Sequence, residues 1–266
     1  GLCHSVQVCV PDLMRQLGME YDSTVQYKIA GINHQAWLLE VSKNGVDLYP
    51  EIKRRSLEQG APPYDRVRHE MMHKFGYYIT ESSEHTSEYL PYFIKSAHPE
   101  LIERFNIPLD EYPRRCIAQI EDWKHRRELL VSEHKLEHVR THEYASYIIE
   151  SMVYNRVYKL GGNVLNHGLI TNLPQDACVE VPCLIDASGV QPVVVGDLPP
   201  QLAALNRTNI NPQLLTIEAA LTGKKEYIYH AAMLDPHTSA ELTMDEIVAM
   251  CDDLIEAHGS WLPAYK

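Results

Sequence analysis

The chain has 266 residues, of which 45% are hydrophobic, and this is enough to bury a sizeable core. Its 36 acidic residues outnumber its 24 basic ones, and the formal net charge of -12 argues against binding to nucleic acid or to an anionic membrane surface. The six cysteines form no CxxC pair, and no apolar run reaches the roughly 18 residues that span a bilayer, so we expect a soluble, cytoplasmic protein with reduced thiols.

The first third of the chain predicts helices and strands in alternation. The expected elements are a helix over residues 1–20, strands over residues 25–30 and 36–42, and a helix over residues 65–75. Pro11 interrupts the first helical pattern and Gly18 ends it, while Gly76 is a usual helix end. His34 then falls in the tight connection between the two strands.

The remainder of the chain is predicted to be mostly helical, with one hairpin. The expected elements are charged helices over residues 112–142 and 141–154, hairpin strands over residues 178–186 and 190–195, a helical region over residues 199–233, and a last helix over residues 243–258. The helical region is expected to break at Pro212 and Gly223, and the last helix opens with the capping box Thr243-Met-Asp-Glu246. We therefore expect one α+β domain over residues 1–266.

Cys3 and His34 are the first residues whose types indicate chemistry. Each lies in a predicted connection among polar neighbours, and a thiolate with an imidazole suits a divalent transition metal. Two protein ligands leave coordination positions open for a substrate, as a catalytic metal requires. The alternative interpretation is that Cys3 and His34 are ordinary buried residues that only contribute to packing.

A second candidate is His69-Glu-Met-Met-His73, which matches the HExxH helix of zinc proteases. Its surroundings are basic, and a third ligand would come from Glu81, Glu84, His85 or Glu88 without a pattern to decide. A five-residue pattern with two free positions also arises by chance in a chain with 14 histidines. From the residues alone, a zinc-protease helix and a chance match stay open as alternatives; the family resemblance given below implies that the match is accidental.

Tyr77 follows directly after a predicted helix and begins a run of polar residues that ends at His85. Such runs converge on pockets more often than on cores. A tyrosine acts as a base only if its pKa falls from about 10, and a nearby divalent cation would lower it. Simple packing of Tyr77 is the alternative.

Several motifs in the same order resemble family 4 glycoside hydrolases of the α-galactosidase (melibiase) type. They are Gly1-Leu-Cys-His-Ser-Val-Gln7, Gly31-Ile-Asn-His34, Phe75-Gly-Tyr-Tyr-Ile-Thr-Glu-Ser-Ser-Glu-His85, Asn172-Leu-Pro174 and Asp235-Pro-His-Thr238. The resemblance extends from residue 1 to residue 262. It implies an α+β fold similar to the C-terminal domain of lactate and malate dehydrogenases and of family 4 glycosidases.

The resemblance also implies an NAD-dependent and divalent-metal-dependent glycosidase, a class outside the usual two-carboxylate mechanism. In that mechanism NAD⁺ oxidises C3 of the sugar, a base removes the proton at C2, and the aglycone is eliminated before water adds. The resemblance assigns Mn²⁺, or another divalent transition metal, to Cys3 and His34. It assigns the C2 base to Tyr77, with Tyr78 as the alternative, contact with the leaving group or its protonation to His4, and sugar hydroxyls to Asn33.

The main departure from the family pattern concerns the nucleotide-binding domain. Family members carry a nucleotide-binding Rossmann domain with a glycine-rich turn before the metal cysteine. No glycine-rich phosphate motif occurs in this sequence, so we expect that domain to be absent from this chain. The sequence therefore assigns no NAD-binding residues. The expected partner is a small α-linked galactoside, and the expected assembly is a homodimer or homotetramer.

Two rival functions remain. An α-galacturonidase or α-glucosidase of the same family would share the metal and base residues, and recognition of a carboxylate would need an extra arginine, for which Arg207 is a candidate. The other rival is an inactive fragment with no turnover of its own.

Overall fold

The computed structural model describes residues 1–133 and 143–266, and its centre is an antiparallel sheet. The strands run in the order β3-β2-β1-β6-β5, with β4 beside β2 and β7 beside β6. Their bounds are β1 Val25–Ile32, β2 Gln35–Lys43, β3 Val46–Asp47, β4 Tyr78–Ile79, β5 Tyr158–Leu165, β6 Cys178–Asp186 and β7 Gly189–Pro192.

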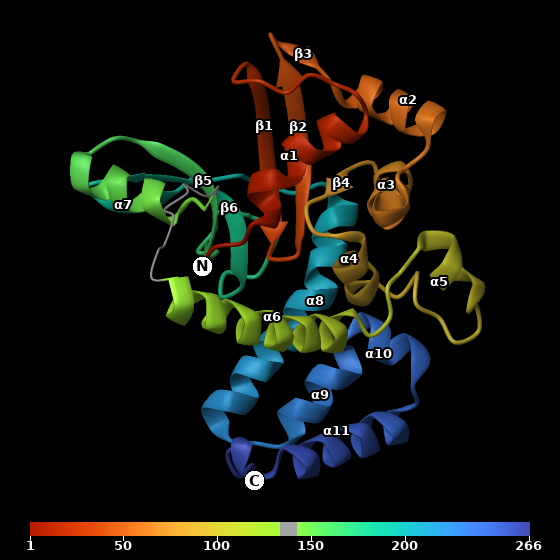
Figure 1. The fold of residues 1–266 in the computed structure, drawn as a ribbon. Helices are drawn as coiled ribbons and strands as arrows, with labels where there is room; N and C mark the ends of the chain where they lie inside the picture. Colours follow the sequence, from red (N-terminus) through yellow and green to blue (C-terminus); the bar gives the residue numbers. More distant parts are fainter. Residues whose placement is uncertain (134–142) are drawn as a thin grey trace.

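Helices surround this sheet and extend beyond it. Their bounds are α1 Ser5–Gln16, α2 Tyr49–Gln59, α3 Arg66–Phe75, α4 Ser83–Tyr89, α5 Glu100–Phe105, α6 Glu111–Glu133, α7 Ala145–Tyr154, α8 Pro200–Thr222, α9 Glu226–Leu234, α10 Pro236–Glu241 and α11 Met244–His258, with 3-10 turns at Pro63–Asp65 and Gly259–Trp261. The helix α8 runs from the sheet to α9, α10 and α11, which gather at the end of the molecule that carries the C-terminus (Figure 1). Within the described ranges, no helix has both the length and the apolar composition needed to cross a membrane.

The core is formed by helices that bury one face against the sheet. On α1 the apolar residues recur three or four positions apart, so Val6, Val10 and Leu13 all point at β1 and β2. Trp37 of β2 faces the other way, and its indole Nε1 donates to Oδ1 of Asn206 on α8 at 3.3 Å. The sheet is therefore held between α1 on one side and α3 and α8 on the other.

The α+β class and the main predicted elements are confirmed. The first helix continues through Pro11, and the hairpin, the end of α3 at Gly76 and the capping box of α11 lie where the sequence places them. The expected break at Pro212 is wrong, because α8 continues through that proline to Thr222. The part of the predicted charged helices that falls on residues 134–142 lies outside the described residues.

Candidate metal and sugar site

Cys3 is held at the edge of the sheet by pairing between the N-terminal residues and β5. The Gly1 ammonium donates to the Asn163 carbonyl at 2.7 Å, and Asn163 N donates to the Gly1 carbonyl at 2.9 Å. The helix α1 then begins at Ser5 and passes very close to Gly161, where an added Cβ would lie 2.7 Å from the Val6 methyl groups. These contacts place Cys3 in the short segment between β5 and the start of α1.

His34 lies in the turn between β1 and β2, and the backbone conformations of two residues in this hairpin determine its orientation. Gly31 has φ 155, and a Cβ there would lie 2.6 Å from Cα of Ala36, so the hairpin closes only with glycine. His34 itself has φ 63, a left-handed conformation that histidine adopts more often than most residues. Its ring stacks on His85, with centroids 5.1 Å apart.

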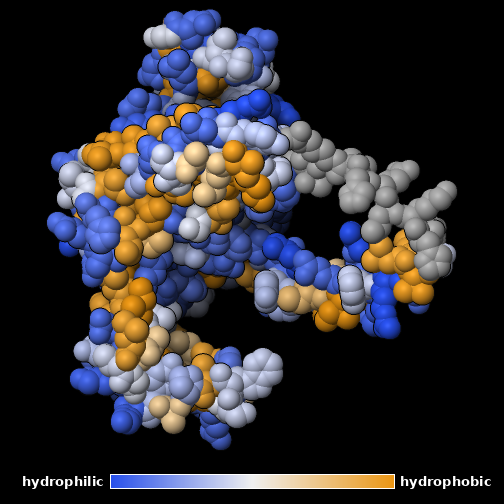
Figure 2. Space-filling model, turned by 90° about the vertical axis from the view of Figure 1, so that its left-hand side faces the viewer, coloured by the Kyte–Doolittle hydropathy of each residue, from blue (hydrophilic) through white to orange (hydrophobic). Residues whose placement is uncertain are grey.

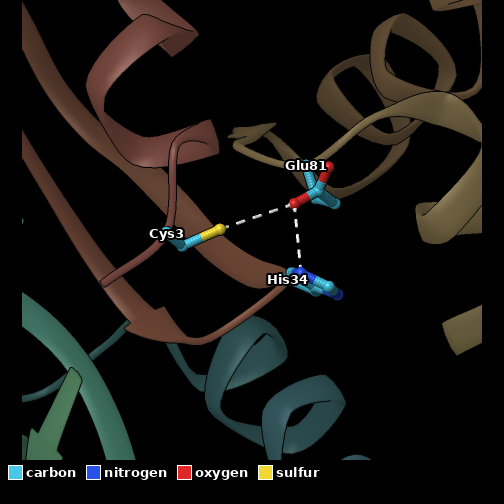
Figure 3. A group of neighbouring side chains, drawn as sticks. All are labelled: Cys3, His34 and Glu81. Carbon is cyan, nitrogen blue, oxygen red and sulfur yellow. Dashed lines mark hydrogen bonds and ion pairs between the residues drawn. The ribbon is translucent and has the colours of Figure 1, made fainter. Parts of the chain in front are cut away.

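Glu81 completes a three-residue cluster with Cys3 and His34 (Figure 3). Its Oε2 lies 3.8 Å from Cys3 Sγ and 3.4 Å from His34 Nε2, while Ser82 N donates to its Oε1 at 2.9 Å. The three ligand atoms all lie within 4.8 Å of one another, and the side chains are partly exposed. One sulfur, one nitrogen and one oxygen can hold a divalent transition metal and leave positions open.

A buried carboxyl group lies behind this cluster. Glu180 of β6 is 0% exposed, accepts a hydrogen bond from Asn163 Nδ2 at 3.1 Å, and has no hydrogen-bond partner for Oε2 among the described residues. Burial, reinforced by the nearby Cys3 sulfur, raises the pKa of Glu180 to about 8. Burial therefore favours the neutral form of Glu180 in the metal-free protein, and nothing in the sequence pattern of its strand indicates a buried acid.

The tyrosine beside the cluster is Tyr89. Its hydroxyl lies 3.3 Å from His34 Nδ1, and the two rings meet edge to face with centroids 5.8 Å apart. Burial, followed by the charges of Glu88 and Glu81, raises the pKa of its phenol in the metal-free protein. Sequence reasoning missed this residue, which lies four positions beyond His85, where the polar run after Tyr77 ends.

The two tyrosines named from the sequence lie elsewhere. Tyr77 packs edge to face on Tyr49, with centroids 5.9 Å apart, and within the described ranges no hydrogen bond joins it to Cys3, His34 or Glu81. Its role as the base stays a prediction. Tyr78 is fully buried and donates to the Asp65 carboxylate, and burial raises the pKa of its phenol well above the usual value. Tyr78 is therefore unsuited to be a base.

His4 and Asn33 flank the cluster as neighbours of its ligands in the chain. The ring of His4 is exposed, and its Nε2 lies 2.9 Å from Glu143 Oε2. The hydrogen bond to Glu143 and the charge of that carboxylate raise the pKa of His4, which favours the protonated ring. Asn33 and Tyr89 both line one groove.

The two histidines of the HExxH match, His69 and His73, both contact the hydroxyl of Ser56. Ser56 Oγ lies 2.6 Å from His69 Nδ1 and 2.9 Å from His73 Nε2, so one hydroxyl bridges both rings. Glu81 belongs to the Cys3 cluster, and the other ligands considered for this match, Glu84, His85 and Glu88, lie together on α4. The interpretation of the match as accidental agrees with this geometry.

The sequence was compared with models of known protein families. Residues 29–238 match the model described as "Family 4 glycosyl hydrolase C-terminal domain". The chain belongs to glycosyl hydrolase family 4. This confirms the family and the fold that the motifs predicted.

Two curated members of family 4 are similar over the whole chain. The alpha-galactosidase of Bacillus subtilis (strain 168) is 63% identical over 267 residues, covering 100% of this chain and 62% of that protein. The alpha-galactosidase of Rhizobium meliloti (strain 1021) is 33% identical over 279 residues, covering 100% of this chain and 56% of that protein. The chain thus spans about three fifths of the length of these family 4 relatives.

A solved structure of a family 4 enzyme shows the same fold. The crystal structure of a 6-phospho-alpha-glucosidase from gut microorganisms, in complex with NAD and Mn²⁺, matches with a TM-score of 0.74 at 21% identity, covering 100% of this chain and 62% of that chain. At this identity the match supports the fold alone.

Proposed function

We propose that this chain is the metal-binding and sugar-binding part of an NAD-dependent and divalent-metal-dependent α-galactosidase. The observation that carries the proposal is the cluster of Cys3, His34 and Glu81 with the Tyr89 hydroxyl beside it. The 63% identity to an alpha-galactosidase supports the choice of sugar.

The donor set fits the Mn²⁺, or another divalent transition metal, that the proposal requires. Cys3, His34 and Glu81 would hold the ion, and their partial exposure leaves room for sugar oxygens. A dication bound there supplies positive charge next to the sugar hydroxyls and stabilises negative charge that develops on them. The same charge would lower the pKa of the Tyr89 phenol, opposing the effect of burial.

The chain's own residues then carry two proton transfers. Tyr89, held at 3.3 Å from His34 Nδ1, is the base for the proton at C2 of the sugar. His4 is the acid that protonates the departing glycosidic oxygen, because the Glu143 carboxylate beside it raises the pKa of its imidazole. Asn33 offers amide hydrogen bonds to sugar hydroxyls from the same turn that carries His34.

The proposal also needs NAD, for which this chain offers no glycine-rich phosphate-binding sequence. We propose that residues 1–266 form a single domain that acts together with a separate nucleotide-binding Rossmann domain of the same protein. The support is that the chain covers 62% of its alpha-galactosidase relative. No NAD-binding role is assigned to a residue of this chain.

The test is release of p-nitrophenol from p-nitrophenyl α-galactoside by the full-length protein that contains this chain. We expect turnover that requires NAD⁺, Mn²⁺ and reductant together, that is lost in Cys3→Ser, and that falls by about 100-fold or more in Tyr89→Phe. Tyr77→Phe is the matched control and should retain most of the activity. Turnover that is indifferent to NAD⁺ and metal would contradict the proposal, and a loss in Tyr77→Phe with activity kept in Tyr89→Phe would move the base back to Tyr77.

A homodimer or homotetramer belongs to the same proposal. The helix α6 stands away from the body of the molecule as an arm (Figure 2) and exposes Tyr112, Ile120 and Trp123 on one face. A second copy of the chain would bury this face. Analytical ultracentrifugation tests this, because Trp123→Glu should shift the assembly toward monomers if α6 forms the interface.

We also place the protein in the cytoplasm. The proposed ligand Cys3 is a free thiol, as are the other five cysteines, and a thiol ligand needs a reducing compartment. Fractionation of cells that express the full-length protein tests the location.

A further inference from the structure

A groove of about 570 Å³ opens beside the metal cluster, a volume within the range of roughly 300–1,000 Å³ that is typical of small-molecule sites. It lies between the β1–β2 turn, the end of α4, α8 and the start of α10. The polar side chains that line it include those of Asn33, Glu88, Tyr89, Asn209, Gln213 and Asp235.

The groove is continuous with the residues that surround His34. Asn33 is its neighbour in the chain, and the Tyr89 hydroxyl lies 3.3 Å from its Nδ1. Asn209, which is only 4% exposed, donates through Nδ2 to the Tyr89 carbonyl at 3.3 Å and to Gln35 Oε1 at 3.1 Å. This wall is therefore held in place before a ligand arrives, and a molecule anchored at the cluster would extend along it.

The charges along the groove all have one sign. Glu88 and Asp235 line it, and no Lys, Arg or His does so among residues 1–133 and 143–266. The position of Asp235 is fixed, because its Oδ1 caps α10 by accepting from His237 N at 3.1 Å and Thr238 N at 2.8 Å. A phosphate or carboxylate group in the groove would meet repulsion without a compensating cation in the groove wall, because His85, whose Nδ1 lies 3.0 Å from Glu88 Oε2, does not line the groove.

Arg207 does not supply that cation. It lies on α8 two residues before Asn209, and helical residues two apart point in different directions. Its side chain is exposed and is not part of the groove wall. The arginine considered from the sequence for recognition of a uronic acid therefore lies in the wrong place.

We propose that this groove binds an uncharged sugar unit of the substrate and that Glu88 and Asp235 exclude sugars that carry a phosphate or a carboxylate. Amides of Asn33 and Gln213 provide donors and acceptors for hydroxyl groups, and Asn209, whose Nδ2 already donates to Gln35 and Tyr89, provides only its Oδ1 acceptor. This rests on the proposed function, since it assumes that the sugar is anchored at the Cys3 cluster.

The test compares binding of galactose, galactose 6-phosphate and galacturonate to the Mn²⁺-loaded full-length protein by calorimetry at low ionic strength. We expect both anionic sugars to bind at least about tenfold more weakly than galactose. In the double variant Glu88→Gln and Asp235→Asn this ratio should shrink severalfold, because asparagine keeps the α10 cap while the charge is removed. Glu256→Gln removes an exposed charge on α11 and should leave the ratio unchanged.

Equal binding of the three sugars, or a ratio that the double variant leaves unchanged, would overturn the inference. The hydrolysis assay on the same preparation keeps the two proposals apart. NAD- and metal-dependent hydrolysis together with equal sugar binding refutes only the role of the groove, whereas hydrolysis that needs neither cofactor refutes the proposed function.

Discussion

Replacing Glu180 by glutamine should change how the stability of the protein depends on pH. Burial raises the pKa of this carboxyl group from 4.5 in the unfolded chain to about 8 in the folded one. Folding therefore favours the protonated form, and the stability that this provides is complete below pH 4.5 and is lost as the pH rises toward about 8. Since one pKa unit is worth about 1.4 kcal/mol, the whole effect is about 5 kcal/mol, of which about 3 kcal/mol falls between pH 5 and pH 8.

Glutamine has nearly the same shape and no charge, so Glu180→Gln removes this dependence. The assay is urea unfolding of metal-free, reduced protein at pH 5 and pH 8. The stability of the variant relative to wild type should rise by about 3 kcal/mol between these pH values. Glu40→Gln, on an exposed side chain of β2 that is 73% accessible, is the control and should show almost no such change. A relative stability that is independent of pH would refute the argument that Glu180 is buried as a neutral acid.

Two further substitutions test the framework of the site. Gly31→Ala should destabilise the protein by several kcal/mol in urea unfolding and weaken metal binding, because the new Cβ would lie 2.6 Å from backbone atoms of the hairpin. The control Gly45→Ala, with open space around it, should cost only about 1 kcal/mol. Equal losses of stability in the two variants would show that the hairpin adapts to the new side chain. Tyr78→Phe should cost about 1–3 kcal/mol in thermal or urea unfolding, because the buried Asp65 carboxylate loses a donor, and an unchanged stability would indicate that this hydrogen bond contributes nothing.

Local patterns in the sequence were sufficient for the longer helices and for strands β1, β2, β6 and β7, whereas α2, α4, α5 and β5 were not predicted. The apolar spacing of α1 and the capping box of α11 are signals carried by neighbouring residues, and both elements form where expected. Pro212 shows the limit of such rules. A proline removes one backbone donor from a helix, but α8 is packed against the sheet and against α9, and tertiary contacts keep it continuous.

The sequence predicted the two motif residues of the site, but it did not predict the residues that surround them. Cys3 and His34 stand out by type and by their polar neighbours. Glu81 is one of many polar residues in its run and Tyr89 lies beyond that run, and only the fold shows that both face His34. Glu180 sits in a strand whose pattern gives no hint of a buried acid. Its environment depends on residues such as Asn163, which are distant in the sequence and adjacent only in the sheet.

Binding of Co²⁺ to the reduced protein shows whether Cys3 is a metal ligand, since a thiolate ligand gives an intense near-ultraviolet charge-transfer band. Wild type should show this band, Cys3→Ser should lose it, and Glu81→Gln should weaken binding. Cys116→Ser, which changes a cysteine on α6, should leave the band unchanged. A band of full intensity in Cys3→Ser, or its absence from wild type, would contradict the assignment of Cys3, His34 and Glu81 as the metal ligands.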